Sequence, residues 1–118
     1  MLFRFRNFRV YKDALNFRKE IYELTKKFPK GELFNLTSQT RRAANSILLN
    51  IAEGSNRLTD LDFGRFLNTS LTSLEEVVAC LDIALDEKYI SAKEHDEYLA
   101  KAELLGKKLI AFCKKLRT

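Results

Sequence analysis

Apolar residues recur along the chain at alternating steps of four and three positions. The first series consists of Val10, Ala14, Phe17, Ile21, Leu24 and Phe28. This spacing places all six side chains on one face of an α-helix that packs against a core. Pro29 and Gly31 follow, and proline disfavours helical geometry in the residue before it. We therefore predict a first helix over residues 10–28.

A second helix is predicted between Thr37 and Gly54. Thr37 is a candidate N-cap and Gly54 a candidate residue just beyond the C-cap. The inward stripe is Ala44, Ile47 and Ile51, and further apolar residues off that stripe are Ala43, Leu48 and Leu49. A helix that is apolar around much of its girth is normally buried on more than one side. In so small a domain we expect the second side to contact another subunit.

Two more amphipathic helices follow, each with a recognisable start. Thr59 precedes Asp60 and Asp62, which places a hydroxyl cap and two carboxylates at the positive end of a helix dipole. Ser91 and Glu94 have the spacing of a capping box. The third stripe is Phe63, Leu67, Ser70, Leu74, Val77, Leu81 and Ala84, and the fourth is Leu99, Ala102, Leu105, Leu109, Phe112 and Leu116.

These four helices, joined by short connections, predict an all-α protein with an up-down-up-down antiparallel four-helix bundle. A chain of 118 residues has the size of one domain. Only four glycines and one proline interrupt it, which favours long helices over strands and turns. We predict a single domain over residues 1–118, of which residues 1–9 form an N-terminal arm.

Charge is distributed unevenly along the chain, whose net charge is +5. Residues 1–30 hold nine Lys/Arg and three Asp/Glu, residues 101–118 hold six and one, and residues 31–100 hold six and twelve. In an up-down-up-down bundle the first and last helices are neighbours, so the two basic segments share a side. We interpret this side as a candidate nucleic-acid surface. Its candidate residues are Arg4, Arg6, Arg9, Lys12, Lys19, Lys26, Lys101, Lys107, Lys108, Lys114 and Lys115.

The arm alternates aromatic and cationic residues in Phe3-Arg4-Phe5-Arg6-Asn7-Phe8-Arg9. Such side chains stack on bases and neutralise phosphates. The same alternation describes an arm whose phenylalanines pack against the bundle while its arginines face water, and the lysine rows are equally compatible with an ordinary solvated face. Arg41, Arg42 and Arg57 are expected to form ion pairs with the acidic middle segment.

No catalytic apparatus, metal site or cofactor site is recognisable in the sequence. His95 is the single histidine, so every candidate nucleophile would have to share it. Cys80 and Cys113 lack the spacing of a metal or redox motif, and we interpret both as core thiols. We predict that the protein is not an enzyme. No apolar run approaches the length of about 20 residues that spans a bilayer, and no secretion signal is apparent, so we expect a cytoplasmic protein.

The stretch from residue 39 to residue 54, QTRRAANSILLNIAEG, resembles the central signature of the bacterial 23S rRNA intervening-sequence protein family, whose members are also called four helix bundle proteins. Further similar segments are Phe8 to Tyr11, Phe28-Pro29 with Glu32, Phe63 to Phe66, Ser73 to Glu75, and Tyr89-Ile90. Tyr11 replaces the tryptophan common in that family, and Leu48-Leu49 stand where many members have a proline. The family name refers to insertions in ribosomal RNA genes and establishes no activity.

The resemblance implies a four-helix bundle that assembles as a homopentamer. It also implies a relation to the accessory proteins of diversity-generating retroelements, which bind nucleic acid and partner with a reverse transcriptase. The signature residues are Ser46, Asn50, Glu53 and Gly54. Within this signature we expect Gly54 to end the second helix in a left-handed conformation, and Ser46 and Asn50 to hydrogen-bond across a helix interface.

Two hypotheses for function follow. The first is a non-catalytic oligomer that binds nucleic acid, structured RNA rather than DNA, by contacts to phosphates from a basic helix face. The alternative is an oligomeric protein scaffold for an acidic partner, with no role in nucleic-acid binding. The first requires the first and fourth helices to lie side by side and to present one continuous row of lysines.

Overall fold

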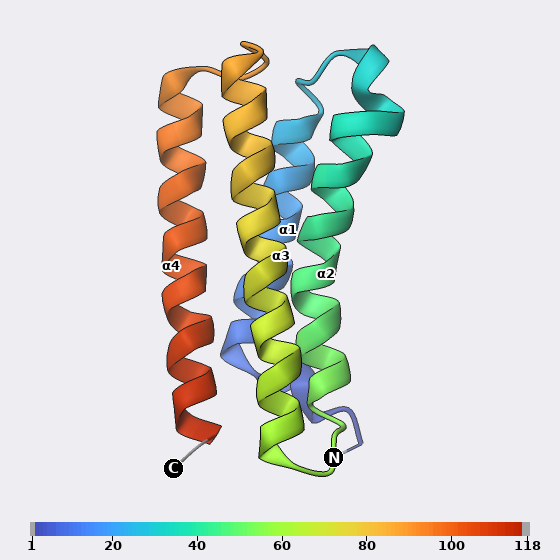
Figure 1. Cartoon of the computed structure of the whole chain (residues 1–118), viewed down its shortest axis with the longest axis vertical. Helices are drawn as coiled ribbons and strands as arrows, with labels where there is room; N and C mark the ends of the chain where they lie inside the picture. Colours follow the sequence, from blue (N-terminus) through green and yellow to red (C-terminus); the bar gives the residue numbers. More distant parts are fainter. Residues whose placement is uncertain (1, 117–118) are drawn as a thin grey trace.

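The computed structural model describes residues 2–116 and confirms the all-α, up-down-up-down four-helix bundle (Figure 1). Residues 1, 117 and 118 belong to the predicted domain and lie outside the described residues. The four long helices are α1 (Arg9–Thr25), α2 (Ser38–Gly54), α3 (Asp60–Asp86) and α4 (Ala92–Leu116). A short 3₁₀ helix, η1 (Arg4–Asn7), precedes α1.

Neighbouring helices in the sequence are also neighbours in space, and α1 also contacts α4, as the basic-surface hypothesis requires. The bundle measures 44 × 24 × 20 Å along its principal axes. Because consecutive helices run antiparallel, one end of the bundle holds the beginnings of α1 and α3 and the ends of α2 and α4 (Figure 1). None of the described helices has the length and apolar character needed to cross a lipid bilayer.

The predicted apolar stripes form the core. Every stripe residue of α1, α2 and α3 is buried, and Ala14, Ile21 and Ile47 are completely inaccessible to solvent. The stripe of α4 is less enclosed, because Leu99, Phe112 and Leu116 are only half-buried. Helix α4 thus lies at the less tightly covered side of the bundle.

The expectation that Ala43, Leu48 and Leu49 of α2 contact another subunit is wrong for two of the three residues. Ala43 and Leu48 are buried within this single chain, and only Leu49, with 54% of its surface exposed, faces outward. The reason is that α2 packs between α1 and α3, so its partners on both flanks come from the same chain. The wide apolar face of α2 is therefore no indication of a second subunit.

The start and end of the α1–α2 connection differ from the prediction. Helix α1 ends at Thr25, and the chain continues to Phe28 in tighter turns, in which the Phe28 N–H donates to the Thr25 carbonyl at 3.0 Å. Thr37 is not an N-cap: it lies inside a π-helical turn, η3 (Leu33–Thr37), that leads directly into α2. Because the backbone is already helical before Thr37, no free N–H group there requires a cap.

The predicted starts of α3 and α4 are confirmed. The Asp62 N–H donates to Thr59 Oγ1 at 3.1 Å, which is an N-cap bond. At the start of α4 the Glu94 N–H donates to Ser91 Oγ at 3.1 Å, and the Ser91 N–H donates to Glu94 Oε1 at 3.0 Å. These two reciprocal bonds make the capping box.

The predicted left-handed conformation at Gly54 is wrong, since no glycine among the described residues has a positive φ. Gly54 is instead the last residue of α2, and a Cβ placed on it would lie 2.6 Å from Phe66 Cβ and 2.8 Å from Phe63 Cδ1. Glycine therefore allows α2 and α3 to approach closely. A left-handed residue does follow a helix elsewhere: Lys88, just after α3, has φ of 62°.

Candidate nucleic-acid interface

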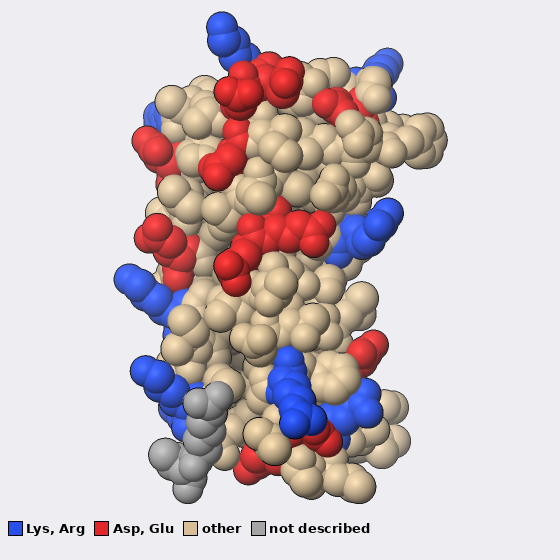
Figure 2. Space-filling view, in the orientation of Figure 1, with Lys and Arg blue, Asp and Glu red and all other residues tan. Residues whose placement is uncertain are grey.

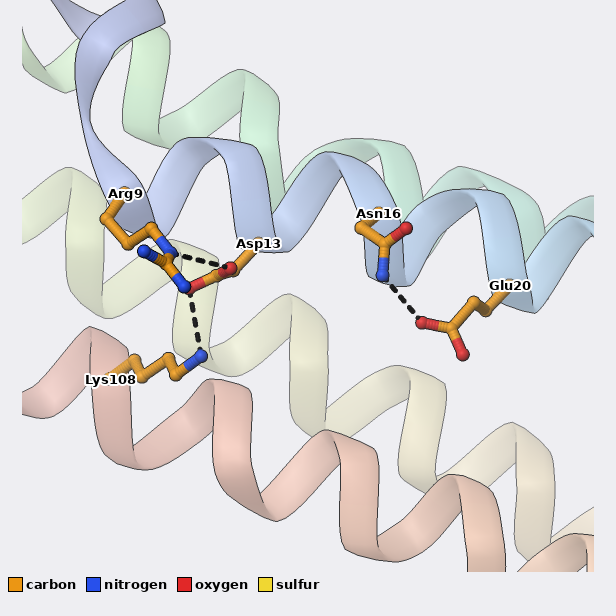
Figure 3. A network of polar contacts seen from close by, with 5 residues as sticks. All are labelled: Arg9, Asp13, Asn16, Glu20 and Lys108. Atoms are coloured by element: carbon orange, nitrogen blue, oxygen red, sulfur yellow. Dashed lines mark hydrogen bonds and ion pairs between the residues drawn. The ribbon is translucent and has the colours of Figure 1, made fainter.

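Ion pairs hold the interface between α1 and α4 together. Lys108 Nζ on α4 donates to Asp13 Oδ2 on α1 at 3.0 Å, and Arg9 Nε donates to Asp13 Oδ1 at 3.4 Å (Figure 3). About two helical turns further along, Lys101 on α4 pairs with Glu20 on α1. The basic side chains that face the other helix are thus used to join the two helices.

The pairing extends to the far end of the same interface. Lys27, just after α1, pairs with Glu94 at the start of α4, and Lys26, the C-cap of α1, pairs with Glu23 in the last turn of that helix at 3.0 Å. The hydrogen bond between Lys27 and Glu94 raises the pKa of Lys27 above its usual value and lowers the pKa of Glu94 below its usual value. Hydrogen bonding to Glu20 likewise raises the pKa of Lys101.

These contacts correct the picture of one continuous lysine face. Of the eleven candidates, Arg9, Lys26, Lys101 and Lys108 are in ion pairs. Within residues 2–116, the exposed candidates without any polar partner are Arg6, Lys12, Lys19, Lys107 and Lys114, and Arg4 is exposed with a backbone carbonyl as its partner. Lys115 is exposed near the end of α4. A row of lysines is present along α1 and α4, but carboxylates interrupt it about every two turns of the α1–α4 contact.

The N-terminal arm packs mainly on the bundle. The Phe8 ring lies 5.1 Å from that of Phe112 and 6.2 Å from that of Phe63. Arg4 Nη2 donates to the Ser55 carbonyl at 2.9 Å, and its guanidinium lies over Phe8 and Phe63. Arg4 is therefore fixed to the loop after α2, whereas Arg6 is exposed. The packing interpretation of the arm describes Phe8 and Arg4 better than base stacking does.

Charge is separated between the two halves of the bundle. The half formed by residues 2–15, 46–70 and 104–116 holds ten Lys/Arg and four Asp/Glu, and we call it the basic half. The other half, residues 16–45 and 71–103, holds ten Lys/Arg and twelve Asp/Glu, and we call it the acidic half. Figure 2 shows one face of this arrangement, where acidic side chains cross the upper and middle parts and most basic side chains lie below, beside a few acidic ones.

Eight of the eleven predicted residues lie in the basic half; the exceptions are Lys19, Lys26 and Lys101. Two residues of this half, Arg57 and Arg65, are missing from the sequence-based set. Arg57 lies over the Phe66 ring at 4.3 Å, and Arg65 pairs with Asp62 at 3.1 Å. Counting charge by segment placed both residues in the acidic middle of the chain. In the antiparallel bundle, however, the α2–α3 loop and the first half of α3 lie in the basic half.

The predicted ion pairs of Arg41, Arg42 and Arg57 are wrong. Arg41 Nε donates to the hydroxyl of Thr25 at 2.9 Å and its guanidinium lies over Tyr22, and Arg57 contacts an aromatic ring. Arg42 is exposed. Most acidic residues of the middle segment lie on α3, on the connection to α4 and at the start of α4, and within residues 2–116 none of them is in an ion pair with these arginines.

The signature residues of α2 have structural contacts. Ser73 Oγ on α3 donates to Ser46 Oγ on α2 at 2.8 Å, so the expected hydrogen bond across a helix interface is present for Ser46. Asn50 bonds instead within its own helix, donating to the Ser46 carbonyl at 2.8 Å. Glu53 is exposed. A further cross-helix bond joins the buried Ser70 hydroxyl to the Ile47 carbonyl at 2.7 Å.

The remaining chemically reactive side chains form no cluster. Cys80 is buried, and burial raises the pKa of its thiol, while Cys113 is half-buried on α4. His95 Nε2 lies 2.8 Å from Asp82 Oδ1 on the neighbouring helix. Within the described part of the chain, His, Cys, Asp and Glu residues form no group of three that would hold a metal ion.

The geometry therefore defines an antiparallel four-helix bundle with one basic half. A sequence profile of the family described as 23S rRNA-intervening sequence protein matches residues 6–111. The chain belongs to that family, as the resemblance at α2 indicated.

A solved structure supports the same assignment. A protein with unknown function of the S23 ribosomal protein family, from Bacteroides thetaiotaomicron VPI-5482, superposes with a TM-score of 0.80 at 25% sequence identity. The alignment covers 89% of this chain and 98% of that chain, so the similarity includes the whole bundle. No protein in a search of curated proteins matches the chain.

Proposed function

We propose that the protein binds structured RNA through the phosphates, using the basic half of the bundle. The observation that carries this proposal is the set of exposed cations there that contact neither a carboxylate nor another polar or aromatic group of the described chain: Arg6, Lys12, Lys107 and Lys114. They come from the arm, α1 and α4, which meet at one end of the molecule. Such cations release condensed counterions from a phosphate backbone, and this release drives binding that depends on salt.

Contacts to phosphates fit these side chains better than reading of bases. Lysines are flexible point charges on the outer rows of two helices, and they position a backbone without reporting its sequence. Two of the three aromatic rings of the arm are occupied, because Phe8 contacts Phe112 and Phe5 contacts Tyr11, and only Phe3 is exposed. We therefore expect recognition of RNA shape and charge, in the cytoplasm, without catalysis.

Charge reversal tests this proposal. Lys107→Glu with Lys114→Glu changes two unpaired lysines of the basic half. Lys30→Glu with Lys93→Glu makes the same change in net charge at two exposed, unpaired lysines of the acidic half. We expect the first pair to lower affinity for a structured RNA by at least about tenfold and the second to change it much less. Equal effects of the two pairs would contradict a localised interface.

Self-association is a second part of the proposal. A groove of about 820 Å³ lies between the first half of α3 and the second half of α4, and we call it the α3–α4 groove. Its apolar lining includes two outward-facing residues, Leu61 (69% exposed) and Ile110 (44% exposed). Apolar surface of this kind is a common mark of an interface between subunits. The resemblance implies five subunits, and we adopt the homopentamer as the proposed assembly.

Sedimentation equilibrium at micromolar concentration measures the assembly directly. We expect a species of five chains, and we expect Leu61→Arg with Ile110→Arg to reduce its size. These two variants introduce charge at exposed positions, so folding of the chain is expected to be retained. A monomer of the unmodified protein under these conditions would contradict the proposed assembly.

The α3–α4 groove also keeps the alternative function open. Arg65 and Lys114 line it together with the apolar residues, which suits an acidic amphipathic partner. The scaffold hypothesis predicts that a partner protein purifies with this chain after nuclease treatment. The RNA hypothesis predicts that nuclease removes what purifies with it.

A further inference from the structure

Two arginines share one tyrosine ring between α1 and α2. Arg18 Cζ lies 4.1 Å and Arg41 Cζ 4.8 Å from the centroid of the Tyr22 ring. Arg18 Nε donates to Asn45 Oδ1 at 2.5 Å, and Asn45 Nδ2 donates to the Tyr22 hydroxyl at 3.0 Å. Arg41 Nε donates to the buried hydroxyl of Thr25 at 2.9 Å. The two guanidinium groups are therefore held in place by neutral partners.

No carboxylate balances this pair of charges. The acidic residues of α1 are engaged elsewhere, because Asp13 and Glu20 pair with lysines on α4 and Glu23 pairs with Lys26. Helix α2 has a single acidic residue, Glu53, which lies twelve positions beyond Arg41 and therefore about 18 Å further along the helix axis. Within residues 2–116 neither guanidinium is in an ion pair.

Most of the hydrogen-bond donors of this arginine pair are unused. A guanidinium has five N–H donors in a fixed fork, and in each arginine only the Nε–H is bonded. Both side chains are half-buried, which weakens solvent screening and strengthens their mutual repulsion. An anion that accepts from both forks removes the repulsion and satisfies the free donors together.

We propose that Arg18 and Arg41 form a binding site for a phosphate group. A phosphate matches the fork of a guanidinium and has oxygens for two forks at once. The Tyr22 ring contacts both guanidinium groups and supports them. The unused groups of the site are N–H donors, so the site recognises a phosphate and not the base or sugar attached to it.

This site lies on the α1–α2 side, outside the basic half, and it does not depend on the proposed RNA interface. The phosphate it binds has two possible sources, a free or small-molecule phosphate and the backbone of a nucleic acid. Both supply the same oxygens, and two titrations distinguish them. The first uses inorganic phosphate, and the second uses a short single-stranded oligonucleotide without a terminal phosphate.

The arginine Nε–Hε signals in ¹⁵N NMR spectra of the full chain report binding at the site itself. We expect inorganic phosphate to shift the signals of Arg18 and Arg41 in a saturable way, with sodium chloride at equal ionic strength producing no such shift. Arg18→Gln or Arg41→Gln should weaken phosphate binding by at least about tenfold, because each removes one fork. Arg42→Gln makes the same change in charge at the adjacent, exposed position and should leave binding unchanged.

Several results would overturn the proposal. They are an absence of saturable shifts, shifts equal to those with chloride, an equal loss in Arg42→Gln, or tighter binding of acetate than of phosphate, which would indicate a site for a protein carboxylate. Arg18→Lys and Arg41→Lys retain the charge without the fork, and we expect intermediate affinity if they remain folded as judged by thermal unfolding. Phosphate binding should persist in the Lys107→Glu, Lys114→Glu protein, which separates this site from the RNA interface.

Discussion

Asp13 on α1 accepts a hydrogen bond from Lys108 on α4 at 3.0 Å, and the same carboxylate accepts from Arg9 at 3.4 Å. One acidic side chain thus neutralises two of the cations that the sequence assigns to the nucleic-acid surface. Arg9, Asp13 and Lys108 all lie in the basic half, which also contains the unpaired lysines. The relationship makes Asp13 a negative element inside the proposed RNA interface.

Asp13→Asn is therefore expected to strengthen RNA binding. The substitution releases Arg9 and Lys108 to contact phosphates, and the dependence of log Kobs on log salt should steepen by about one unit or more. The free energy of unfolding should fall by about 0.5–1 kcal/mol, since the ion pairs are partly exposed. Fluorescence anisotropy with a labelled RNA measures the affinity, and chemical denaturation measures the stability.

Asp86→Asn is the matched control for this prediction. It makes the same chemical change at an exposed residue of the acidic half that has no ion-pair partner among the described residues. We expect little effect on RNA affinity. An equal gain in both variants would mean that net charge, and not position, determines binding.

Gly54→Ala should destabilise the protein. The added Cβ would lie 2.6 Å from Phe66 Cβ, an atom fixed to the backbone of α3, so α2 and α3 would have to separate. Overpacking of this kind costs about 1–3 kcal/mol and outweighs the helix preference of alanine. Gly31→Ala, where nothing lies within 4 Å of the added Cβ, should change the unfolding free energy by less than about 0.5 kcal/mol. Similar values for both variants would contradict the close contact.

Lys88→Gly should stabilise the protein. Lys88 has a left-handed φ of 62°, and its N–H donates to the Leu85 carbonyl at 2.9 Å while the Tyr89 N–H donates to the Ala84 carbonyl at 2.8 Å. This is a Schellman end of α3, in which a Cβ is unfavourable. We expect a gain of about 0.5–1 kcal/mol in the unfolding free energy, after the added flexibility of the unfolded chain is included. Lys88→Ala, which retains the Cβ, should give no such gain.

Stability should decrease at acidic pH, and Glu94 should contribute to the decrease. Its pKa is lowered in the folded protein by hydrogen bonding to Lys27 and the Ser91 N–H, relative to the ordinary value of 4.5. A carboxylate with a lowered folded pKa contributes stability that is present above the unfolded pKa and lost as pH falls through the folded pKa. Unfolding free energy should therefore fall from about pH 5 downward.

Glu94→Gln tests the pH effect because glutamine keeps an oxygen acceptor for the Ser91 N–H and removes the charge. The variant should be less stable than the unmodified protein at pH 7, and the two should converge at the lowest pH. Thermal unfolding followed across this range provides the comparison. A constant difference between the two proteins at every pH would exclude a contribution from the Glu94 charge.

Much of the fold follows from local pattern. The alternating steps of four and three identify the core because an α-helix repeats every 3.6 residues, and all stripe residues of α1 to α3 are buried. Thr59 and Ser91 were predicted correctly as caps because a cap is a contact over three residues. The neighbouring positions of α1 and α4 follow from short connections in an antiparallel bundle.

Features that depend on contacts between helices were not predictable in this way. A left-handed helix end was predicted at Gly54 and, among the described residues, occurs at Lys88, because glycine at position 54 is required by the approach of α3 and not by a turn. Segment charges concealed the pairing of Asp13 and Glu20 with α4. The Arg18–Arg41 pair was not predictable from the sequence, because its members lie on different helices and both contact the ring of Tyr22.

The salt dependence of RNA binding tests the central proposal most directly. Affinity for one structured RNA would be measured between about 50 and 200 mM salt for the unmodified protein and for the triple variant Lys12→Ala, Lys107→Ala, Lys114→Ala. We predict a steep loss of affinity with salt for the unmodified protein, and a slope smaller by about two to three units for the variant. Affinity that is independent of salt, or an unchanged slope in the variant, would contradict binding of RNA phosphates by the basic half.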